Sequence, residues 1–276
     1  MPELPEVETI ARALRQGERG GSSILNRSVL SAEVLWARSI AEPAADLFSQ
    51  RITGQTILDV GRRGKYIQIQ LNRGALLIHL RMSGDLLVMP ETEPVGPHDR
   101  VLLHLDQDMR LAFNDARKFG RLWLTADPQR VSCGLGGEPL DEDLTPVAFH
   151  QMLRGKSRQL KPLLLDQAFL SGLGNIYTDE ALNLACLSPF QNSAQMTEGQ
   201  AARLLSAIRD VLQEGIRRNG ASIDWVYRGG DFQNHFRVYQ RTGQPCPKCG
   251  TPVERTVVGQ RGTHYCPVCQ PLPPGK

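Results

Sequence analysis

The spacing of apolar residues predicts a helix near the start of the chain. Between Pro5 and Gly17 they recur at positions i, i+3, i+4 and i+7 and form one stripe, consisting of Val7, Ile10, Ala11 and Leu14. Proline is favoured in the first turn of a helix and glycine just past its last turn. We therefore expect a helix from Pro5 to Gly17, with Glu3 and Glu6 at its positive end.

From Ile24 to Leu124 the pattern changes to short runs of four to seven apolar or β-branched residues, separated by Gly, Asn and Pro. Such runs are typical of strands joined by turns. The predicted strands lie around Val29 and at 52–60, 66–71, 76–80, 86–89, 101–105 and 122–124. This series predicts an antiparallel β-sandwich or a barrel-like sheet.

The stretch GLGGEPLDEDLTP, residues 134–146, is rich in Gly, Pro and acidic residues and is expected to link two halves of the chain. Beyond it the apolar spacing becomes helical at 149–153 and 181–184, and most strongly from Thr197 to about Arg218. We therefore predict a compact helical domain after the linker. Residues 217–236 combine Gly, aromatic residues and Arg without a clear period, and we expect a mobile loop there.

Composition adds a charge asymmetry to this picture. The 276 residues, 41% of them hydrophobic, suffice for two domains and a small appendage. Residues 1–150 contain 17 Lys and Arg against 20 Asp and Glu, whereas the remainder contains 15 against 9. The basic second half favours a polyanion such as nucleic acid as partner, although a solvated charged face would give the same count.

The chain shows no pattern typical of export or of membrane insertion. No apolar run approaches the roughly 18 residues of a membrane span. The acidic segment from Met1 to Glu8 is the opposite of the basic start of a signal peptide. We therefore expect an intracellular protein without a membrane partner.

Four cysteines form two Cys-x2-Cys pairs with 16 residues between them, which is zinc-ribbon spacing; they are Cys246, Cys249, Cys266 and Cys269. The last thirty or so residues are too few to bury an apolar core, so a module there needs a metal ion or a disulfide to stabilise it. We predict one structural Zn²⁺. Four thiolates close its coordination sphere, so catalysis must lie elsewhere. Disulfide pairing is the alternative. Cys133 and Cys186 do not belong to a Cys-x2-Cys pair, and we expect both to be reduced and partly buried.

The N-terminus offers candidate chemistry. An initiator methionine is normally removed before a small residue, which would expose the secondary amine of Pro2. An α-amino group titrates near roughly 8, so much more of it is nucleophilic at neutral pH than of a lysine. Its attack on an aldehyde-level carbon gives an iminium that permits elimination, with Glu3 and Glu6 beside it as acid, base or charge partner. Alternatively, these residues only cap and charge the first helix.

Six motifs in order along the chain carry a specific resemblance: PELPEVET at 2–9, GRRGKY at 61–66, HLRMSG at 79–84, DARKFG at 115–120, GLGNIYTDE at 172–180 and VYQRTGQPC at 238–246. The chain resembles the bacterial formamidopyrimidine-DNA glycosylases, which repair 8-oxoguanine. The resemblance implies an α+β protein with a two-layer β-sandwich and flanking helices, a helix-two-turn-helix domain and a zinc finger. It places the catalytic domain at 1–133, a linker at 134–144, the helical domain at 145–232 and the zinc finger at 233–276.

The resemblance also implies the catalytic residues. Pro2 matches the nucleophile that attacks C1′ of the damaged nucleotide, and Glu3 matches the general acid-base. Lys65 in GRRGKY matches a lysine with a proton-donor and phosphate-contact role in β-elimination. Arg261 lies at the tip of a predicted hairpin between the two cysteine pairs and matches the arginine that grips phosphates and serves δ-elimination. One Schiff base would then lead to both eliminations and leave a one-nucleotide gap.

An enzyme that acts on a base in a duplex must extrude it, and the vacated space costs a few kcal/mol unless something fills it. By the resemblance, Met82 fills the space, Arg117 hydrogen-bonds the orphaned cytosine and Phe119 wedges between base pairs. Core packing is the alternative for Met82 and Phe119. Phosphate contacts are implied for His79, His98, Lys156, Lys161 and Asn175. Residues 222–230 correspond to a segment that closes over the flipped base, without an assigned contact.

Two other functions remain open. An endonuclease VIII-like glycosylase for oxidised pyrimidines shares the terminal proline and glutamate, but its opening is of the PEGPE type. A zinc-ribbon protein that binds distorted DNA without catalysis would share the cysteine pairs. We expect a cytoplasmic, nucleoid-associated monomer whose partner is double-stranded DNA with oxidised bases, without an obligate protein partner.

Overall fold

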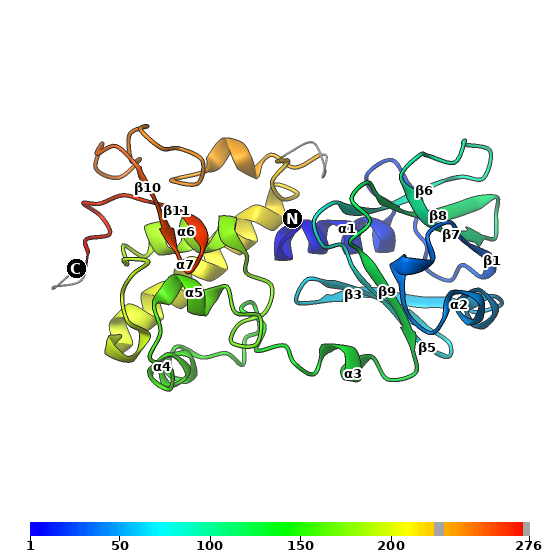
Figure 1. Ribbon diagram of the computed structural model, residues 1–276, viewed down its shortest axis with the longest axis horizontal. Coiled ribbons are helices and arrows are strands. Elements are labelled where there is room, and N and C mark those ends of the chain that lie inside the picture. Colours follow the sequence, from blue (N-terminus) through cyan, green and yellow to red (C-terminus); the bar gives the residue numbers. More distant parts are fainter. Residues whose placement is uncertain (224–228, 273–276) are drawn as a thin grey trace. The chain divides into compact units, whose positions relative to one another are not determined.

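The computed structural model describes residues 1–223 and 229–272. The chain forms two compact units. The N-terminal unit consists of Met1–Cys133 with Asn219–Gly230, and the C-terminal unit consists of Gly134–Arg218 with Asp231–Lys276 (Figure 1). Within the described residues, none of the helices has the length and apolar character that crossing a membrane requires.

The N-terminal unit is a sandwich of two β-sheets, as the sequence predicts (Figure 1). One sheet has the order β1 (Val29–Val34), β7 (Asp99–Leu105), β8 (Met109–Asp115) and β6 (Gly84–Pro90). The other has the order β2 (Ile40–Glu42), β9 (Arg121–Thr125), β5 (Gly74–His79), β4 (Tyr66–Leu71) and β3 (Ile57–Arg63). Neighbouring strands are antiparallel except β2 and β9, which are parallel. Alternate residues of both sheets meet in one apolar core.

Helix α1 (Leu4–Gln16) confirms the first predicted helix. Its four-residue apolar stripe is buried in the sandwich core. Pro5 lies in the first turn, and Gly17 ends the helix with a left-handed φ of 79°, which glycine adopts without strain. A side chain at Gly17 would also meet the backbone nitrogen of Ser23 at 2.9 Å.

Three elements of this unit differ from the predicted strand pattern, and one of them is the short strand β2, which was not predicted. The predicted strand at 52–60 begins in helix α2 (Ala45–Ile52), whose residues Phe48 and Ile52 are buried one turn apart. Strand β8 was missed because Arg110 interrupts its apolar run. That side chain is only 2% exposed, and its guanidinium donates hydrogen bonds to the carbonyl oxygens of Glu93 and Pro94 at 2.7 and 3.1 Å. Short elements η1 (Ala37–Ser39) and α3 (Pro128–Ser132) complete the unit.

The C-terminal unit is helical, followed by a two-stranded hairpin. Its helices are α4 (Pro146–Arg154), α5 (Leu160–Leu164), α6 (Asn175–Leu184), η2 (Ser193–Gln195), α7 (Glu198–Arg217) and η3 (Phe232–His235). The predicted helix from Thr197 to Arg218 is confirmed as α7: Thr197 and Gln200 exchange side-chain and backbone hydrogen bonds of 3.2 and 3.0 Å as a capping box. The hairpin consists of β10 (Glu254–Val258) and β11 (Arg261–Tyr265).

The segment predicted as a linker is partly held against the C-terminal unit. The guanidinium of Arg209 on α7 donates to the carbonyl oxygens of Pro139, Asp141 and Leu144 at 2.9, 2.6 and 2.8 Å. The described residues 219–223 and 229–230 belong to the N-terminal unit. The domain boundaries at 133, 144 and 232 stay a prediction. The predicted mobile loop contains η3, and its residues 224–228 lie outside the described residues.

Candidate active site and nucleic-acid interface

The N-terminal residues are fixed by a buried carboxylate. Glu6 is 2% exposed, and its Oε2 accepts a hydrogen bond of 2.8 Å from the backbone nitrogen of Glu3, which is itself 3% exposed. Its Oε1 accepts a bond of 2.7 Å from the backbone nitrogen of Ala221. Glu6 therefore connects the residue after Pro2 to the segment at 219–223 of the same unit. Pro2 is buried, whereas Met1 is 48% exposed and accessible to removal.

Lys65 lies in the turn between β3 and β4. The turn has two residues, Gly64 and Lys65, because Arg63 pairs with Tyr66. Gly64 takes a φ of 56°, and Lys65 is only 5% exposed. Arg62 holds the turn against α1, because its Nε contacts Glu8 Oε2 at 3.1 Å while its Nη1 donates to Gly64 O at 3.0 Å. The predicted catalytic lysine thus stands on a rigid, well-buried turn.

His79, at the end of β5, is held as the neutral imidazole. Burial, followed by the charges of Arg81 and Lys65, lowers the pKa of His79 from 6.5 to about 3. Its Nδ1 accepts a 3.0 Å hydrogen bond from the backbone nitrogen of Arg81, so the ring proton is on Nε2. Tyr66 packs edge-on against the ring, with 4.7 Å between the centroids. His79 can therefore donate to a phosphate as a neutral group but adds no charge.

Two turns of the N-terminal unit carry large apolar side chains that are exposed to solvent, unlike the apolar residues of the core. Met82, between β5 and β6, is 37% exposed, and Phe119, between β8 and β9, is 50% exposed. Core packing is therefore excluded for both. The guanidinium carbon of Arg117 lies 5.2 Å from the centroid of the Phe119 ring. His98 is exposed, and its Nδ1 lies 3.5 Å from Nη2 of Arg100.

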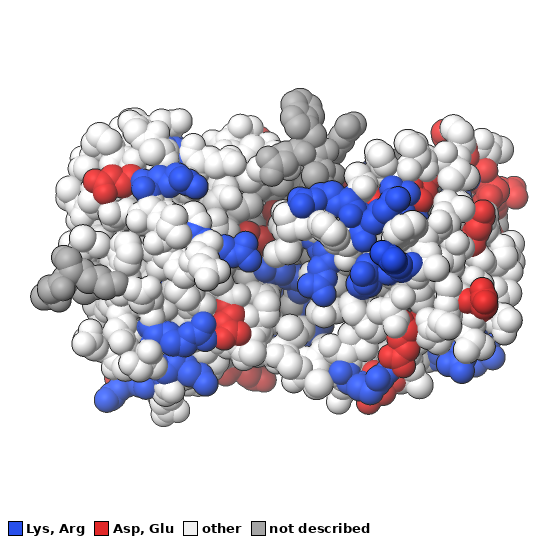
Figure 2. Space-filling view, viewed as in Figure 1, with Lys and Arg blue, Asp and Glu red and all other residues white. Residues whose placement is uncertain are grey.

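Basic side chains surround these turns. Lys118, between Arg117 and Phe119, adopts a φ of 61° and places its Nζ 4.2 Å from the centroid of the Trp36 ring. Arg38 lies over the same ring at 5.9 Å. Lys and Arg side chains gather in groups on the face that Figure 2 shows, and several of these groups lie beside Asp or Glu side chains. Such interleaving of cations and aromatic rings suits contact with a nucleic acid backbone.

In the C-terminal unit, the structure contradicts the predicted phosphate contact of Lys161. Its side chain is fully buried and forms an ion pair with Asp179, also fully buried, with 2.6 Å between Nζ and Oδ1. The same Nζ donates to the carbonyl oxygen of Gly262 at 2.8 Å. An amino group without solvent access and with these two acceptors has a structural role. Lys156, by contrast, is exposed on the surface after α4.

Arg261 is exposed at the start of β11, immediately after the two-residue turn rather than at its tip. The next residue, Gly262, is held through its carbonyl oxygen by Lys161 and by Asn175, whose Nδ2 donates at 3.0 Å. Asp179 also accepts a 2.9 Å bond from the backbone nitrogen of His264. Three side chains of α5 and α6 thus fix the backbone on which Arg261 stands. Asn175 begins α6 as predicted, but its amide binds the hairpin.

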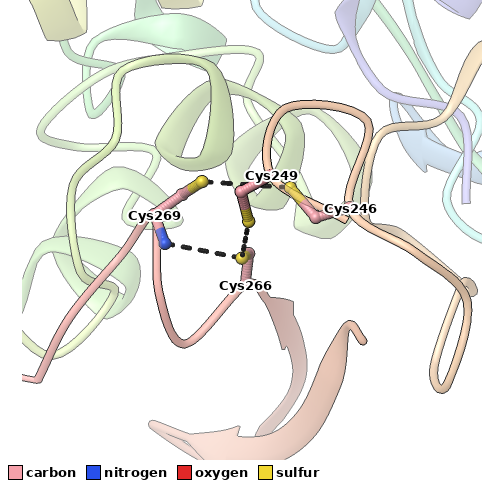
Figure 3. Close-up of side chains that lie close together, drawn as sticks. All are labelled: Cys246, Cys249, Cys266 and Cys269. Carbon is pink, nitrogen blue, oxygen red and sulfur yellow. Dashed lines mark hydrogen bonds between the residues drawn. The ribbon is translucent and has the colours of Figure 1, made fainter. Parts of the chain in front are cut away.

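The four predicted metal ligands point toward one another from two turns (Figure 3). The Sγ atoms of Cys246 and Cys269 are 4.0 Å apart, those of Cys249 and Cys266 are 3.4 Å apart, and all four lie within 4.8 Å of one another. A tetrahedral zinc ion with bonds of about 2.3 Å separates its sulfur ligands by about 3.8 Å, so the set fits one Zn²⁺. Contacts with Thr251 lower the pKa of Cys249 to about 6, whereas burial raises the pKa of Cys266 and of Cys269.

The remaining two cysteines are free. Cys186 is partly buried as predicted, and its Sγ accepts from Lys248 Nζ at 3.0 Å. Cys133 is exposed, so the prediction that it is partly buried is wrong. It follows the last turn of α3, a helix of five residues without a buried side chain.

Sequence reasoning missed several buried acids that organise these regions. Glu180 accepts backbone bonds of 2.7, 2.9 and 2.8 Å from Arg237, Val238 and Tyr239, and burial raises its pKa. Asp115, Asp179 and Glu180 all lie inside the six motifs that carry the resemblance. Asp179 and Glu180 are adjacent to each other and Asp115 follows Asn114, so their local sequence does not distinguish them from exposed acids.

Three family models match consecutive parts of the chain. Residues 1–122 match the formamidopyrimidine-DNA glycosylase N-terminal domain, 135–226 the formamidopyrimidine-DNA glycosylase H2TH domain, and 243–272 the zinc finger found in FPG and IleRS. The last match agrees with the geometry of the four cysteines.

Relatives and solved structures match over nearly the full length. The formamidopyrimidine-DNA glycosylases of Herpetosiphon aurantiacus and Chloroflexus aurantiacus are 42% and 43% identical, and each match covers 98% of this chain and 100% and 98% of the relative. A structure of MutM in complex with carbocyclic 8-oxo-G containing DNA has a TM-score of 0.89 at 34% identity. Lactococcus lactis Fpg with N7-benzyl-Fapy-dG containing DNA has 0.89 at 35%. Each of these two matches covers 98% of this chain and 100% of the other. The chain belongs to the formamidopyrimidine-DNA glycosylase family.

Proposed function

We propose that this protein is a bifunctional DNA glycosylase and abasic-site lyase that excises oxidised purines, 8-oxoguanine and formamidopyrimidines, from double-stranded DNA. Family membership supports glycosylase action in DNA repair. The lesions named for the solved relatives, 8-oxo-G and Fapy-dG, support the substrate class. We also propose that the protein works as a cytoplasmic monomer, because one active site and one duplex require no second copy.

One observation carries the proposal most directly: Met82 and Phe119 are exposed apolar side chains on turns, and the guanidinium of Arg117 lies beside the Phe119 ring. Exposed apolar side chains on a basic surface suit insertion between bases. A protein that extrudes a base needs a side chain to replace it and a donor for the orphaned partner. Met82 has the side chain to fill the vacated space, and Phe119 has the ring to wedge between base pairs. Arg117 has the donors to recognise the orphaned cytosine.

The chemistry begins at Pro2. Loss of Met1 gives a secondary amine, which forms a bond to C1′ of the damaged nucleotide as the bond from C1′ to the base breaks. Glu3 is the general acid-base, held in place by the bond from its backbone nitrogen to Glu6. Protonation of O4′ by Glu3 then breaks the C1′–O4′ bond, which opens the sugar ring and gives the iminium. The iminium acidifies C2′, so loss of that proton expels the 3′ phosphate by β-elimination. A second elimination expels the 5′ phosphate.

The remaining predicted residues contact the phosphates of the DNA or assist their elimination. Lys65 donates a proton or contacts a phosphate during β-elimination, and Arg261 grips the phosphates at the lesion during δ-elimination. His79, His98, Lys156 and Asn175 are further proposed DNA contacts, with His79 acting as a neutral donor. The zinc ion, bound by the four cysteines, stabilises the hairpin that bears Arg261. It takes no part in proton transfer.

Borohydride trapping tests this function. Reduction of the imine should give a covalent complex on DNA that contains 8-oxoguanine opposite cytosine, and the Pro2→Gly variant should lose it while still binding an abasic-site analogue. Trapping only on thymine-glycol DNA would instead identify an endonuclease VIII-like enzyme. Trapping on neither DNA would identify a binding protein without catalysis.

A further inference from the structure

The turns that carry Met82 and Phe119 meet at two buried polar residues. Strands β6 and β8 are neighbours in one sheet, and Gly84 is paired with Asp115 where the two strands approach these turns. Asp115 is fully buried, and Ser83, next to Met82, is 5% exposed. A buried carboxylate at this position must be satisfied by hydrogen bonds.

The side chain of Asp115 receives hydrogen bonds from both turns. Its Oδ1 accepts from the hydroxyl of Ser83 and, at 3.2 Å, from the backbone nitrogen of Arg117. Its Oδ2 accepts from the backbone nitrogen of Gly120 at 2.7 Å. The Ser83 oxygen also accepts from the Arg117 nitrogen at 3.1 Å. The turn with Met82 and the turn with Arg117 and Phe119 therefore share one set of hydrogen bonds.

The backbone of Asp115 extends this connection to strand β7. Its nitrogen donates to the carbonyl oxygen of His98 at 2.8 Å, and its carbonyl oxygen accepts from Arg100 Nε at 2.8 Å. Gly120 closes the turn where a Cβ would lie 2.3 Å from the ring of Phe113. The arrangement leaves little freedom for either turn to move alone.

We propose that Asp115 and Ser83 are positioning residues that make the two turns one rigid element, so that filling the vacated space and recognising the opposite base occur together. The inference rests on the proposed function, because it assumes that Met82, Arg117 and Phe119 contact DNA. Two independent turns would each lose conformational freedom when they bind DNA, whereas a preorganised pair does not. The hydrogen bonds to Asp115 provide that preorganisation.

The most selective variant is Ser83→Ala, because it removes the connection between the turns and keeps the bonds from Arg117 and Gly120 to Asp115. Single-turnover excision of 8-oxoguanine opposite cytosine should slow about tenfold, and the preference for cytosine over adenine opposite the lesion should fall by a similar factor. Borohydride trapping on abasic DNA, which has no base to extrude, should stay within about twofold of wild type. Ser83→Thr keeps the hydroxyl and should restore excision.

A matched control variant shows whether the effect of Ser83→Ala comes from the position of this hydroxyl or from the loss of any hydrogen-bonded hydroxyl. Ser23, in the same unit, also donates and accepts, with bonds of 2.7 Å to Arg15 O and 3.2 Å from the nitrogen of Leu25. Ser23→Ala should leave excision and opposite-base preference unchanged. Asp115→Asn is the second variant, because an amide cannot accept hydrogen bonds on both sides and should reproduce the loss seen with Ser83→Ala.

A double-mutant cycle measures the connection itself. Met82→Ala and Arg117→Ala should have non-additive effects on excision in the wild-type background and additive effects in the Ser83→Ala background. An active wild type whose Ser83→Ala variant keeps normal excision and opposite-base preference would overturn this inference alone. Equal losses in Ser83→Ala and Ser23→Ala would also overturn it. A wild type that neither excises the lesion nor traps on DNA would overturn the proposed function, and this inference with it.

Discussion

The N-terminal sandwich and the C-terminal hairpin both carry exposed residues that we propose to contact DNA, but different forces hold those residues in place. Met82 and Phe119 stand on turns of a sandwich whose two sheets share a large apolar core. Arg261 stands on a two-stranded hairpin with most residues of β10 exposed. That hairpin depends on four cysteines and on the buried pair of Lys161 and Asp179. Where apolar burial is insufficient, metal and charge replace it.

Zinc removal should give the largest effect and should separate the two regions. The free energy of zinc binding is also folding free energy for such modules, on the order of 10 kcal/mol. Chelation or Cys249→Ser should therefore remove hydrogen-exchange protection from residues 254–265 and leave strands β4 and β5 protected. Cys133→Ser, which changes an exposed free cysteine, is the control. Unchanged protection of 254–265 without zinc would show that the hairpin does not need the metal.

The buried ion pair should be next in size. Lys161→Met leaves the carboxylate of Asp179 buried without its partner, which should cost about 3–5 kcal/mol of unfolding free energy in the C-terminal unit. Chemical denaturation monitored separately for each unit would measure it.

The control for the ion pair is Arg158→Ala, which removes an exposed pair with Asp166 at 2.7 Å and should cost less than about 1 kcal/mol. Replacing both buried partners, as in Lys161→Met with Asp179→Leu, should recover part of the loss. Equal losses for the buried and exposed pairs would contradict the role assigned to Lys161.

Two phenylalanine variants distinguish a residue that we propose to contact DNA from a residue of the apolar core. Phe119→Ala should change the unfolding free energy by less than about 0.5 kcal/mol, because the ring is half exposed, yet should slow lesion excision about tenfold or more. Phe48→Ala should cost about 3–5 kcal/mol, because that side chain is fully buried. Thermal denaturation and single-turnover excision would measure the two effects. A large loss of stability in Phe119→Ala would mean that the ring is a packing residue.

The smallest effect at neutral pH is expected for His79, because its pKa shift affects stability only in acid. The pKa of His79 is lowered to about 3 in the folded state, so between pH 6.5 and about 3 the unfolded state binds more protons and stability falls with falling pH. His79→Gln should flatten that slope without changing stability above pH 7. In the pH dependence of excision, His79 should produce no inflection near 6.5. An inflection there that disappears in His79→Gln would show that His79 is charged in the active enzyme.

Local patterns in the sequence predicted most elements of the fold. Short apolar runs between turn residues predicted most of the sandwich strands. Helical spacing predicted α1 and α7, because burial on one face of a helix leaves a period in the sequence. The spacing failed at β8, where Arg110 is buried by bonds to carbonyl oxygens from a distant loop. It also failed at α2, which is too short for its two buried residues to show a period.

The site was predictable as a set of motifs but not as a set of contacts. The roles of Met82 and Phe119 follow from their positions in the motifs, whereas the sequence left core packing open for both until the structure showed them exposed. The phosphate contact predicted for Lys161 depends on the resemblance alone. Its partners Asp179 and Gly262 lie 18 and 101 residues away, and sequence spacing carries no information on such pairs.

The central claim is covalent chemistry at the nitrogen of Pro2, and peptide mapping of the reduced complex tests it most directly. The purified protein should be reduced with borohydride on DNA that contains 8-oxoguanine, digested, and the modified peptide sequenced by mass spectrometry. The account predicts a protein without Met1 whose only DNA adduct is on Pro2. An adduct on Lys65, or an active protein that retains Met1, would contradict it.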